Sequence, residues 1–123
     1  MESRRPFDRP RTEFLTVDVG GGVTLDGCLI KPRDFDGAKK YPVIVYVYGE
    51  PAAQTVVDRW GGNRALFHHA LANEGYVVAS FDNRGTPAPR GVAWRKVVYG
   101  VRTHGSTVSA SAYGAGVGVA RTR

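Results

Sequence analysis

The sequence has few of the groups that build covalent or membrane-spanning frameworks. It contains one cysteine, Cys28, which excludes an internal disulfide. It has no apolar run of the about 18 residues that a membrane helix needs. The charged first residues are not followed by an apolar segment, so they do not predict a secretory signal. The 123 residues suffice for one small domain. The sequence does not identify the cellular compartment of the protein.

Acidic residues are missing from the last third of the chain. Residues 1–82 hold 10 Lys/Arg and 11 Asp/Glu, whereas residues 83–123 hold seven Lys/Arg and no acid. The net charge of +6 therefore arises entirely in the last third. Its basic residues are spread thinly rather than gathered in a run, as a nucleic-acid surface would require. We therefore expect no nucleic-acid partner.

The first third has the pattern of an antiparallel hairpin. Residues 12–19 and 23–31 are rich in β-branched residues and partly alternate between apolar and polar. Gly20–Gly22 between them indicates a turn, and no Lys-Ser/Thr follows these glycines to suggest a phosphate-binding loop. Residues 32–40 are polar and predict a surface loop. Residues 1–11 are Arg/Pro-rich and are interpreted as a connector.

A β-strand, helix and β-strand follow. Residues 42–48 are continuously apolar and residues 76–81 are apolar apart from Ser80, which predicts strands covered on both faces. The helix expected between them spans residues 64–74, with Asn63 as its N-cap and Gly75 at its end. Its expected apolar face comprises Leu66, Phe67, Ala70 and Leu71. Such a βαβ unit predicts neighbouring parallel strands and an α/β fold class.

Beyond residue 86 the pattern weakens. Residues 87–100 predict a further helix around positions 94–99. Residues 101–123 are Gly-, Ala- and Arg-rich without periodicity, and we expect no regular structure in this tail. The domain organisation is therefore a connector over 1–11, a domain segment over 12–100, and an aberrant low-complexity tail over 101–123.

Four segments that follow one another along the chain are informative when they are considered together. They are Lys31-Pro-Arg-Asp-Phe-Asp36, Lys39-Lys-Tyr-Pro-Val-Ile-Val-Tyr-Val-Tyr-Gly-Glu-Pro51, Gly75-Tyr-Val-Val78 and Phe81-Asp-Asn-Arg-Gly-Thr86. Together they resemble the first part of the catalytic domain of dipeptidyl-peptidase-IV-like enzymes in the prolyl oligopeptidase family. Glu13-Phe-Leu-Thr16 and Gly22-Val-Thr-Leu-Asp-Gly27 resemble its opening hairpin. The resemblance covers about residues 11–100.

The resemblance implies a partial α/β-hydrolase fold that stops before the nucleophile elbow. It implies a serine-type peptidase that hydrolyses peptide bonds, often after proline, needs no cofactor or metal, and takes peptides as substrates. Full-length relatives combine the hydrolase domain with an N-terminal β-propeller, are often dimeric, and are cytoplasmic, periplasmic or displayed at the cell surface. No propeller sequence precedes residue 12 here.

The catalytic triad is missing from this sequence. None of the five serines lies in the Gly-x-Ser-x-Gly elbow of an α/β hydrolase. No Asp or Glu follows Asp82, and His104 in the aberrant tail is the only histidine beyond it. We therefore expect this chain to be inactive alone. We also expect a frameshift, assembly break or gene truncation near residue 100, and a poorly stable protein with open sheet edges.

One catalytic position remains. By resemblance, Tyr48 in Tyr48-Gly-Glu-Pro51 stands where the family has a tyrosine whose hydroxyl donates to the oxyanion. A phenol at the end of a buried strand can present such a donor. By strand pattern alone, Tyr48 is one more aromatic residue, like Tyr46. Glu50 departs from the glycine more usual in the family, which affects the loop conformation.

Other residues that could be metal ligands or catalytic groups are better explained by structural roles. Adjacent helical residues point about 100° apart, so His68 and His69 are interpreted as helix-surface histidines rather than metal ligands. Asp82 and Arg84 could be catalytic, but a role in shaping the strand end is the interpretation preferred.

We expect structural roles for the two tryptophans and the cysteine. Trp60 and Trp94 are interpreted as packing residues. Cys28, within a strand pattern, is interpreted as a small buried apolar residue.

Two alternative functions stay open. One is a different α/β hydrolase, such as an acylaminoacyl peptidase or an esterase. The other belongs to another class, a small basic non-catalytic binding protein. Turnover of a Gly-Pro or Ala-Pro chromogenic substrate separates a peptidase from a binding protein.

Overall fold

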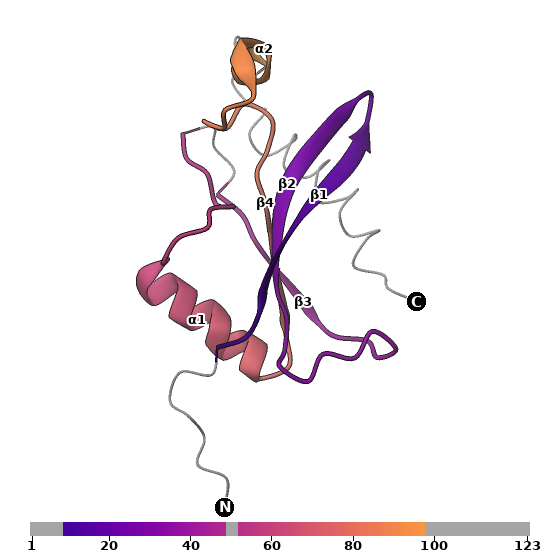
Figure 1. Ribbon diagram of the computed structural model, residues 1–123. Coiled ribbons are helices and arrows are strands. Elements are labelled where there is room, and N and C mark those ends of the chain that lie inside the picture. Colours follow the sequence, from indigo (N-terminus) through magenta and orange to yellow (C-terminus); the bar gives the residue numbers. More distant parts are fainter. Residues whose placement is uncertain (1–8, 49–51, 98–123) are drawn as a thin grey trace, which may run out of the picture.

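A computed structural model describes residues 9–48 and 52–97, which form a four-stranded mixed sheet with two helices (Figure 1). The elements are β1 (Thr12–Gly20), β2 (Val23–Ile30), β3 (Val43–Tyr46), α1 (Gly62–Asn73), β4 (Val77–Phe81) and α2 (Gly91–Lys96). The predictions for Glu50, His104, the tail from 101 onward and most of the connector lie outside the described residues.

The predicted hairpin is present. β1 and β2 pair antiparallel, from Thr12 opposite Ile30 to Asp18 opposite Thr24. The three turn glycines have φ between +61° and +91°, a region that side chains with a Cβ rarely adopt. The Asp18 carboxylate accepts a hydrogen bond from the Gly20 amide at 2.8 Å, which closes the turn.

The predicted βαβ unit is also present, with the hairpin attached to its second strand. β3 and β4 pair parallel, from Val43–Val77 to Tyr46–Ser80. β2 pairs antiparallel with β4, which gives the order β1-β2-β4-β3. A Cβ at Gly27 would lie 2.6 Å from the Phe81 ring, so glycine allows that ring to cross β2.

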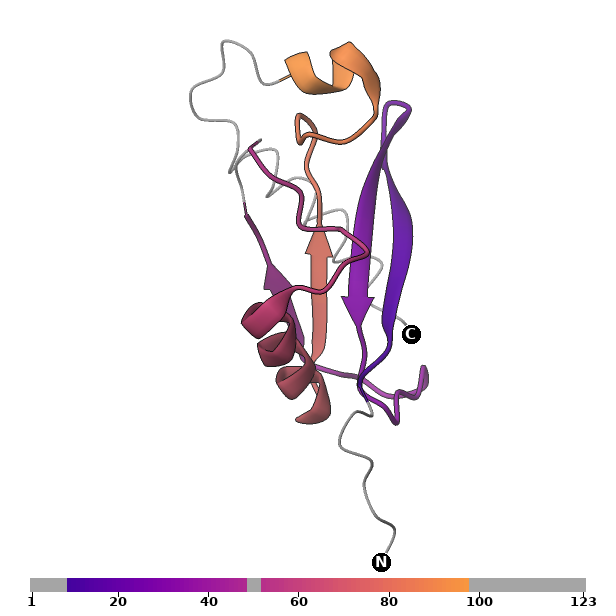
Figure 2. The same cartoon turned by 60° about the vertical axis from the view of Figure 1, so that its left-hand side comes forward.

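Apolar side chains cluster on both faces of the sheet. Successive residues of β4 point to opposite faces, so Val78 faces α1 while Ala79 and Phe81 face away. Under α1, Val78 packs with Ile30 and Ala72. On the other side, Ala79 and Phe81 pack with Val17. Figure 2 shows α1 lying along one face, beside β4.

The expectation that both apolar strands are covered on both faces is wrong for β3. All five residues of β4 are buried, whereas Val43 of β3 is 38% exposed. Within the described residues β3 pairs only with β4, so it forms an edge. An apolar run shows that a strand is suited to burial on both faces. The number of strands beside it depends on the rest of the sheet.

The predicted apolar face of α1 is correct for Leu71, which packs against the core, and wrong for Leu66, Phe67 and Ala70, which are exposed. Leu66 and Phe67 are 51% and 62% exposed, and Ala72 is the fully buried residue. The helix turns Ala65, His68 and Ala72 toward the sheet, and the small side chain of Ala72 allows close approach to β4 at that point.

The ends of α1 differ in how well they were predicted. The helix is preceded by Gly61 as N-cap without a side-chain cap, so Asn63 lies inside it. Gly75 does end it, with φ +96°. Hydrogen bonds from the Gly75 amide to Ala72 O and from the Tyr76 amide to Leu71 O, both 3.1 Å, satisfy the last carbonyls.

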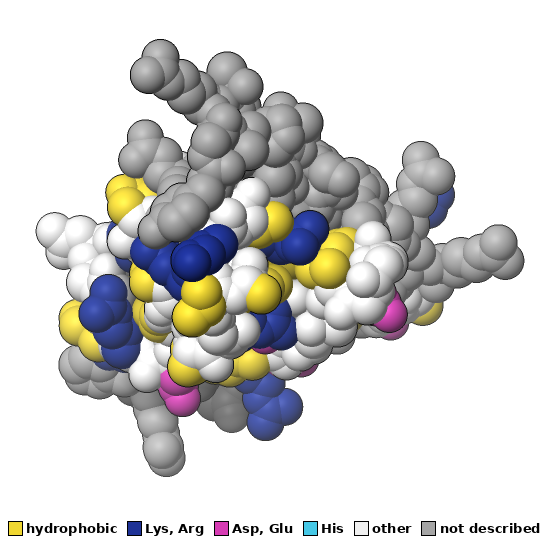
Figure 3. Space-filling model, turned by 90° about the horizontal axis from the view of Figure 1, so that it is seen from above, with side chains coloured by type: hydrophobic (Ala, Val, Ile, Leu, Met, Phe, Trp, Pro, Cys, Tyr) yellow, Lys and Arg dark blue, Asp and Glu magenta, His cyan; other side chains and the backbone are white. Residues whose placement is uncertain are grey.

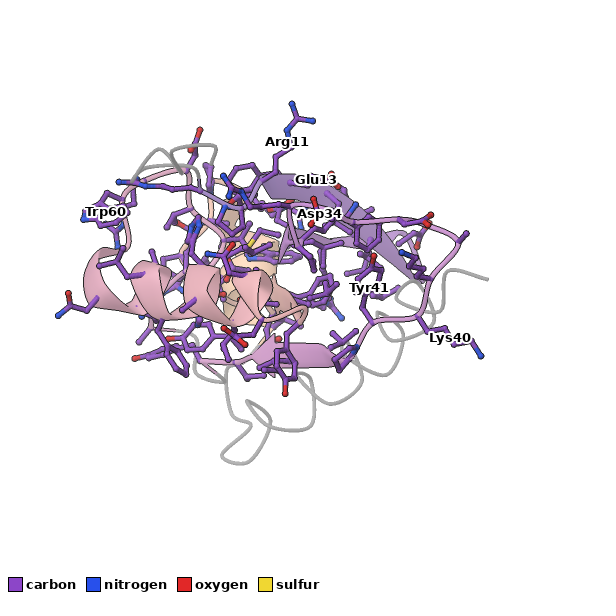
Figure 4. The ribbon with its side chains drawn as sticks, turned by 90° about the horizontal axis from the view of Figure 1, so that it is seen from below. Arg11, Glu13, Asp34, Lys40, Tyr41 and Trp60 are labelled. Carbon is purple, nitrogen blue, oxygen red and sulfur yellow. The ribbon has the colours of Figure 1, made fainter. Side chains whose placement is uncertain are left out.

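The loop between β2 and β3 closes on itself, as its polar sequence predicts. The Tyr41 hydroxyl accepts a hydrogen bond from the Asp36 amide at 2.9 Å, and its ring stacks on Phe35 at 4.9 Å. Lys31 binds Glu13 of β1 at 2.5 Å. In Figure 4, which views the molecule from below, Tyr41 and Asp34 lie in this loop, away from Trp60.

Candidate functional site

The carboxyl ends of β3 and β4 meet at one edge of the sheet, because the two strands are parallel. In open α/β sheets this edge is where ligands bind. Tyr48 follows β3 by two residues and is 46% exposed. Asp82 follows β4 directly. Figure 3 looks down on this end and shows Lys and Arg side chains beside hydrophobic ones.

Asp82 anchors the loop that leads from β3 to α1. Its carboxylate is 3% exposed and accepts hydrogen bonds from the Thr55 amide at 2.7 Å and the Thr55 hydroxyl at 2.8 Å. The Val56 amide donates to the same carboxylate at 3.2 Å. The Asp82 amide donates to Asp26 O of β2 at 2.9 Å. The predicted role of Asp82 in shaping the strand end is thus confirmed.

Ser80 extends this network to β3. Its hydroxyl lies 2.8 Å from the Thr55 hydroxyl and 3.0 Å from the carbonyl oxygen of Tyr46. Sequence analysis missed both Thr55 and Ser80. A signal for Ser80 existed, because it is the one polar residue in the strand Val-Val-Ala-Ser-Phe, and a buried hydroxyl needs a partner.

The turn after Asp82 is tied to the hairpin through α2. The Trp94 indole N–H donates to Thr86 O at 3.1 Å, and the Arg90 guanidinium lies 4.3 Å from the Trp94 ring centre. Arg90 also donates to the Thr24 hydroxyl at 2.8 Å and lies 3.7 Å from the Asp26 carboxylate. The packing role predicted for Trp94 is confirmed.

Arg84, in the same turn, has a buried Nε with no hydrogen-bond partner within the described ranges. The structure assigns it neither a catalytic partner nor an ion pair there.

A cavity of about 420 Å³ lies between α1 and the sheet, and Thr55 and Ser80 of the Asp82 network are part of its lining. Its lining includes Cys28, Tyr46, Trp60, His68 and His69, but not Tyr48. Trp60 is 55% exposed, so its predicted packing role is wrong. Its ring instead carries the Arg9 guanidinium at 4.5 Å, and Figure 4 shows it beside the start of α1.

The two histidines line this cavity rather than the outer surface of α1. Burial, followed by the nearby Arg64 and His69, lowers the pKa of His68. Burial, followed by Arg9, lowers the pKa of His69. Both imidazoles are therefore neutral near pH 7. In the described part of the chain, no three His, Cys, Asp or Glu side chains gather as a metal site would require.

Cys28 is half-buried in β2. Burial, with a smaller contribution from the Asp82 carboxylate, raises the pKa of its thiol to about 11. A thiol that stays protonated is a poor nucleophile, which argues against a nucleophilic role for Cys28.

Comparison with known proteins places this arrangement among peptidases. No protein-family model matches the chain. Dipeptidyl peptidase 8 of Mus musculus is 40% identical over 87 residues, which are 70% of this chain and 10% of that protein. Prolyl endopeptidase FAP of Mus musculus is 36% identical over 84 residues, which are 68% of this chain and 11% of that protein.

A solved structure has the same arrangement. Porphyromonas gingivalis dipeptidyl peptidase 4 superposes with a TM-score of 0.64 at 40% identity, over 74% of this chain and 12% of that one. The chain thus spans about a tenth of the length of the curated relatives it matches. None of the helices within residues 9–48 and 52–97 is long and apolar enough to cross a membrane.

Proposed function

The chain belongs to the dipeptidyl-peptidase-IV-like group of the prolyl oligopeptidase family, and from this membership we propose that residues 12–97 are the opening part of a serine-peptidase catalytic domain. The activity proposed is hydrolysis of peptide bonds, often after proline, with peptides as substrates and no cofactor. The observation that carries it is the match in both sequence and fold to dipeptidyl peptidases.

The proposed fold is the beginning of an α/β-hydrolase sheet. Its support is the hairpin β1–β2 followed by the β3–α1–β4 unit, in one mixed sheet. The names of the matched relatives favour the dipeptidyl branch over an acylaminoacyl peptidase or an esterase. Dimer formation by the complete enzyme is part of the same proposal.

Tyr48 is proposed as a donor to the oxyanion. Its support is its position at the carboxyl end of β3, with a hydroxyl-bearing ring 46% exposed. A donor aimed at the tetrahedral oxygen contributes about 10²–10³ in kcat. The nucleophile, base and acid are not supplied by this sequence, so we expect the chain alone to be inactive.

A chimeric enzyme tests the proposal. Residues 12–97 would replace the matching segment of Porphyromonas gingivalis dipeptidyl peptidase 4, and hydrolysis of Gly-Pro-p-nitroanilide would be measured. We expect an active chimera in which Tyr48→Phe lowers kcat about 10²–10³-fold with little change in KM.

Tyr46→Phe is the matched control, because Tyr46 lies two residues earlier and its hydroxyl accepts a hydrogen bond from Arg64 at 2.9 Å. We expect this control to leave kcat nearly unchanged. A folded but inactive chimera, or equal losses in the two variants, would contradict the proposal.

A further inference from the structure

We propose that Thr55, Ser80 and Asp82, here named the Asp82 clamp, are positioning residues that set the direction of the Tyr48 hydroxyl. The inference rests on the oxyanion role proposed above for Tyr48. None of the three needs to touch substrate, because they act on the backbone on either side of that tyrosine.

The clamp holds the chain before and after Tyr48. Two residues before it, the carbonyl oxygen of Tyr46 lies 3.0 Å from the Ser80 hydroxyl. Seven residues after it, Thr55 is bound to the Asp82 carboxylate through both its amide, at 2.7 Å, and its hydroxyl, at 2.8 Å. The Ser80 and Thr55 hydroxyls lie 2.8 Å apart; since Thr55 donates its hydroxyl proton to Asp82, the single Ser80 proton is shared between Thr55 Oγ1 and the carbonyl oxygen of Tyr46, which links the two anchors.

The clamp is itself fixed to the middle of the sheet. Ser80 and Asp82 are 5% and 3% exposed. Ser80 is paired on both sides, with Cys28 of β2 and Tyr46 of β3. Hydrogen bonds to a buried carboxylate are short and strong, so Thr55 and Val56 are held by the middle of the sheet.

Loss of the clamp should therefore act on the transition state. A donor displaced by about 1 Å can cost about 10²-fold in rate. Since the oxyanion exists only after attack, the loss should be found in kcat and not in KM.

The first test compares two substitutions at one position in the chimeric enzyme. Thr55→Val keeps the amide and the side-chain shape but removes the hydroxyl, and we expect kcat to fall about 10- to 100-fold with KM within about twofold. Thr55→Ser keeps the hydroxyl and should restore kcat to within about twofold of the parent. Melting temperatures of all variants verify the fold.

A double-mutant cycle identifies the residue through which the clamp acts. In the Tyr48→Phe background, Thr55→Val should cause no further loss of kcat. Ser80→Ala provides a second route if Thr55→Val does not fold, because it removes the link to Tyr46 and leaves the bonds from Thr55 to Asp82.

The outcomes separate this inference from the proposed function. A large loss in Tyr48→Phe with unchanged kcat in folded Thr55→Val and Ser80→Ala overturns the clamp alone. Losses that multiply in the double variants also overturn it, since they show action independent of Tyr48. An unchanged kcat in Tyr48→Phe overturns the oxyanion role, and the clamp's role with it.

Discussion

At the residue scale, Asp82 shows how a buried carboxyl group is accommodated by hydrogen-bond donors from a distant loop. Its carboxylate receives N–H and O–H donors from Thr55 and Val56, which belong to a loop 26 and 27 residues earlier. Such donors replace the hydrogen bonds to water that the carboxylate loses when it is buried. The sequence shows Asp82 at the end of an apolar strand, but the identity of its partners depends on where the loop folds back.

The raised pKa of the Cys28 thiol predicts that this residue reacts slowly with disulfide reagents. With a pKa of about 11, about 0.1% of its thiol is ionised at pH 8, so labelling by a disulfide reagent should be at least about 100-fold slower than for free cysteine. The measurement is the labelling rate with 5,5′-dithiobis(2-nitrobenzoate) at pH 8. The same chain unfolded in urea is the control and should react at the rate of free cysteine. Fast labelling of the folded chain would show that β2 does not bury the thiol.

The two cavity histidines predict a pH dependence of stability. Their folded-state pKa values are lowered, so the unfolded chain takes up protons first as the pH falls below about 6.5. The free energy of unfolding should therefore change little between pH 7 and 8 and decrease as the pH falls below about 6.5. Urea midpoints at pH 7.5 and 5.5 measure it.

The control for this prediction is the double variant His68→Gln/His69→Gln. Its urea midpoint should change less over the same pH interval. An equal drop in both proteins would assign the pH dependence to other groups.

At the element scale, α1 shows the limit of apolar periodicity. The sequence predicts that Leu66 and Phe67 face the sheet, yet both are more than half exposed and Ala72 is buried. The histidines at positions 68 and 69 occupy the inward side with Ala65. Close approach to β4 favours small residues at the contact, and hydrophobicity alone cannot report this.

A pair of substitutions distinguishes the two orientations of α1. Phe67→Ala should change the free energy of unfolding by less than about 0.5 kcal/mol, as at other surface positions. Ala72→Leu should cost about 1–3 kcal/mol through overpacking. Urea denaturation measures both. A loss of about 3–5 kcal/mol in Phe67→Ala would restore the orientation predicted from sequence.

The other elements were predictable for identifiable reasons. The hairpin follows from alternation around Gly20–Gly22, and β4 from a run that is apolar apart from Ser80. Gly75 marks the end of α1. The start of α1 and the edge position of β3 were not predictable, because a missing cap and the number of neighbouring strands leave no local signal.

The candidate site was predictable only in part. Tyr48 was found through the resemblance, and Asp82 through its place at a strand end. Thr55 was not found, because a threonine in a long loop gives no sign of a partner 27 residues away.

At the scale of the whole molecule, an edge strand and an exposed apolar surface occur together. β3 has one partner strand among the described residues, and Val43, Val47 and Tyr48 along it are 38%, 41% and 46% exposed. Free edges of this kind pair with other chains.

The chain by itself should therefore associate with increasing concentration. Sedimentation velocity over the micromolar to millimolar range measures this. Val43→Lys places a charge on the edge strand and should reduce association. Val92→Lys, on α2 and 65% exposed, is the matched control and should not. Equal effects of the two lysines would exclude β3 as the associating edge.

The central claim is that Tyr48 stands at an oxyanion site, and a crystal structure of the chimeric enzyme with a peptidyl boronate tests it most directly. The boronate's tetrahedral oxygen stands in for the oxyanion. The account predicts the Tyr48 hydroxyl at about 2.7–3.1 Å from that oxygen, with Thr55 still bound to Asp82. A Tyr48 ring turned away, with the oxygen held by other donors alone, would contradict it.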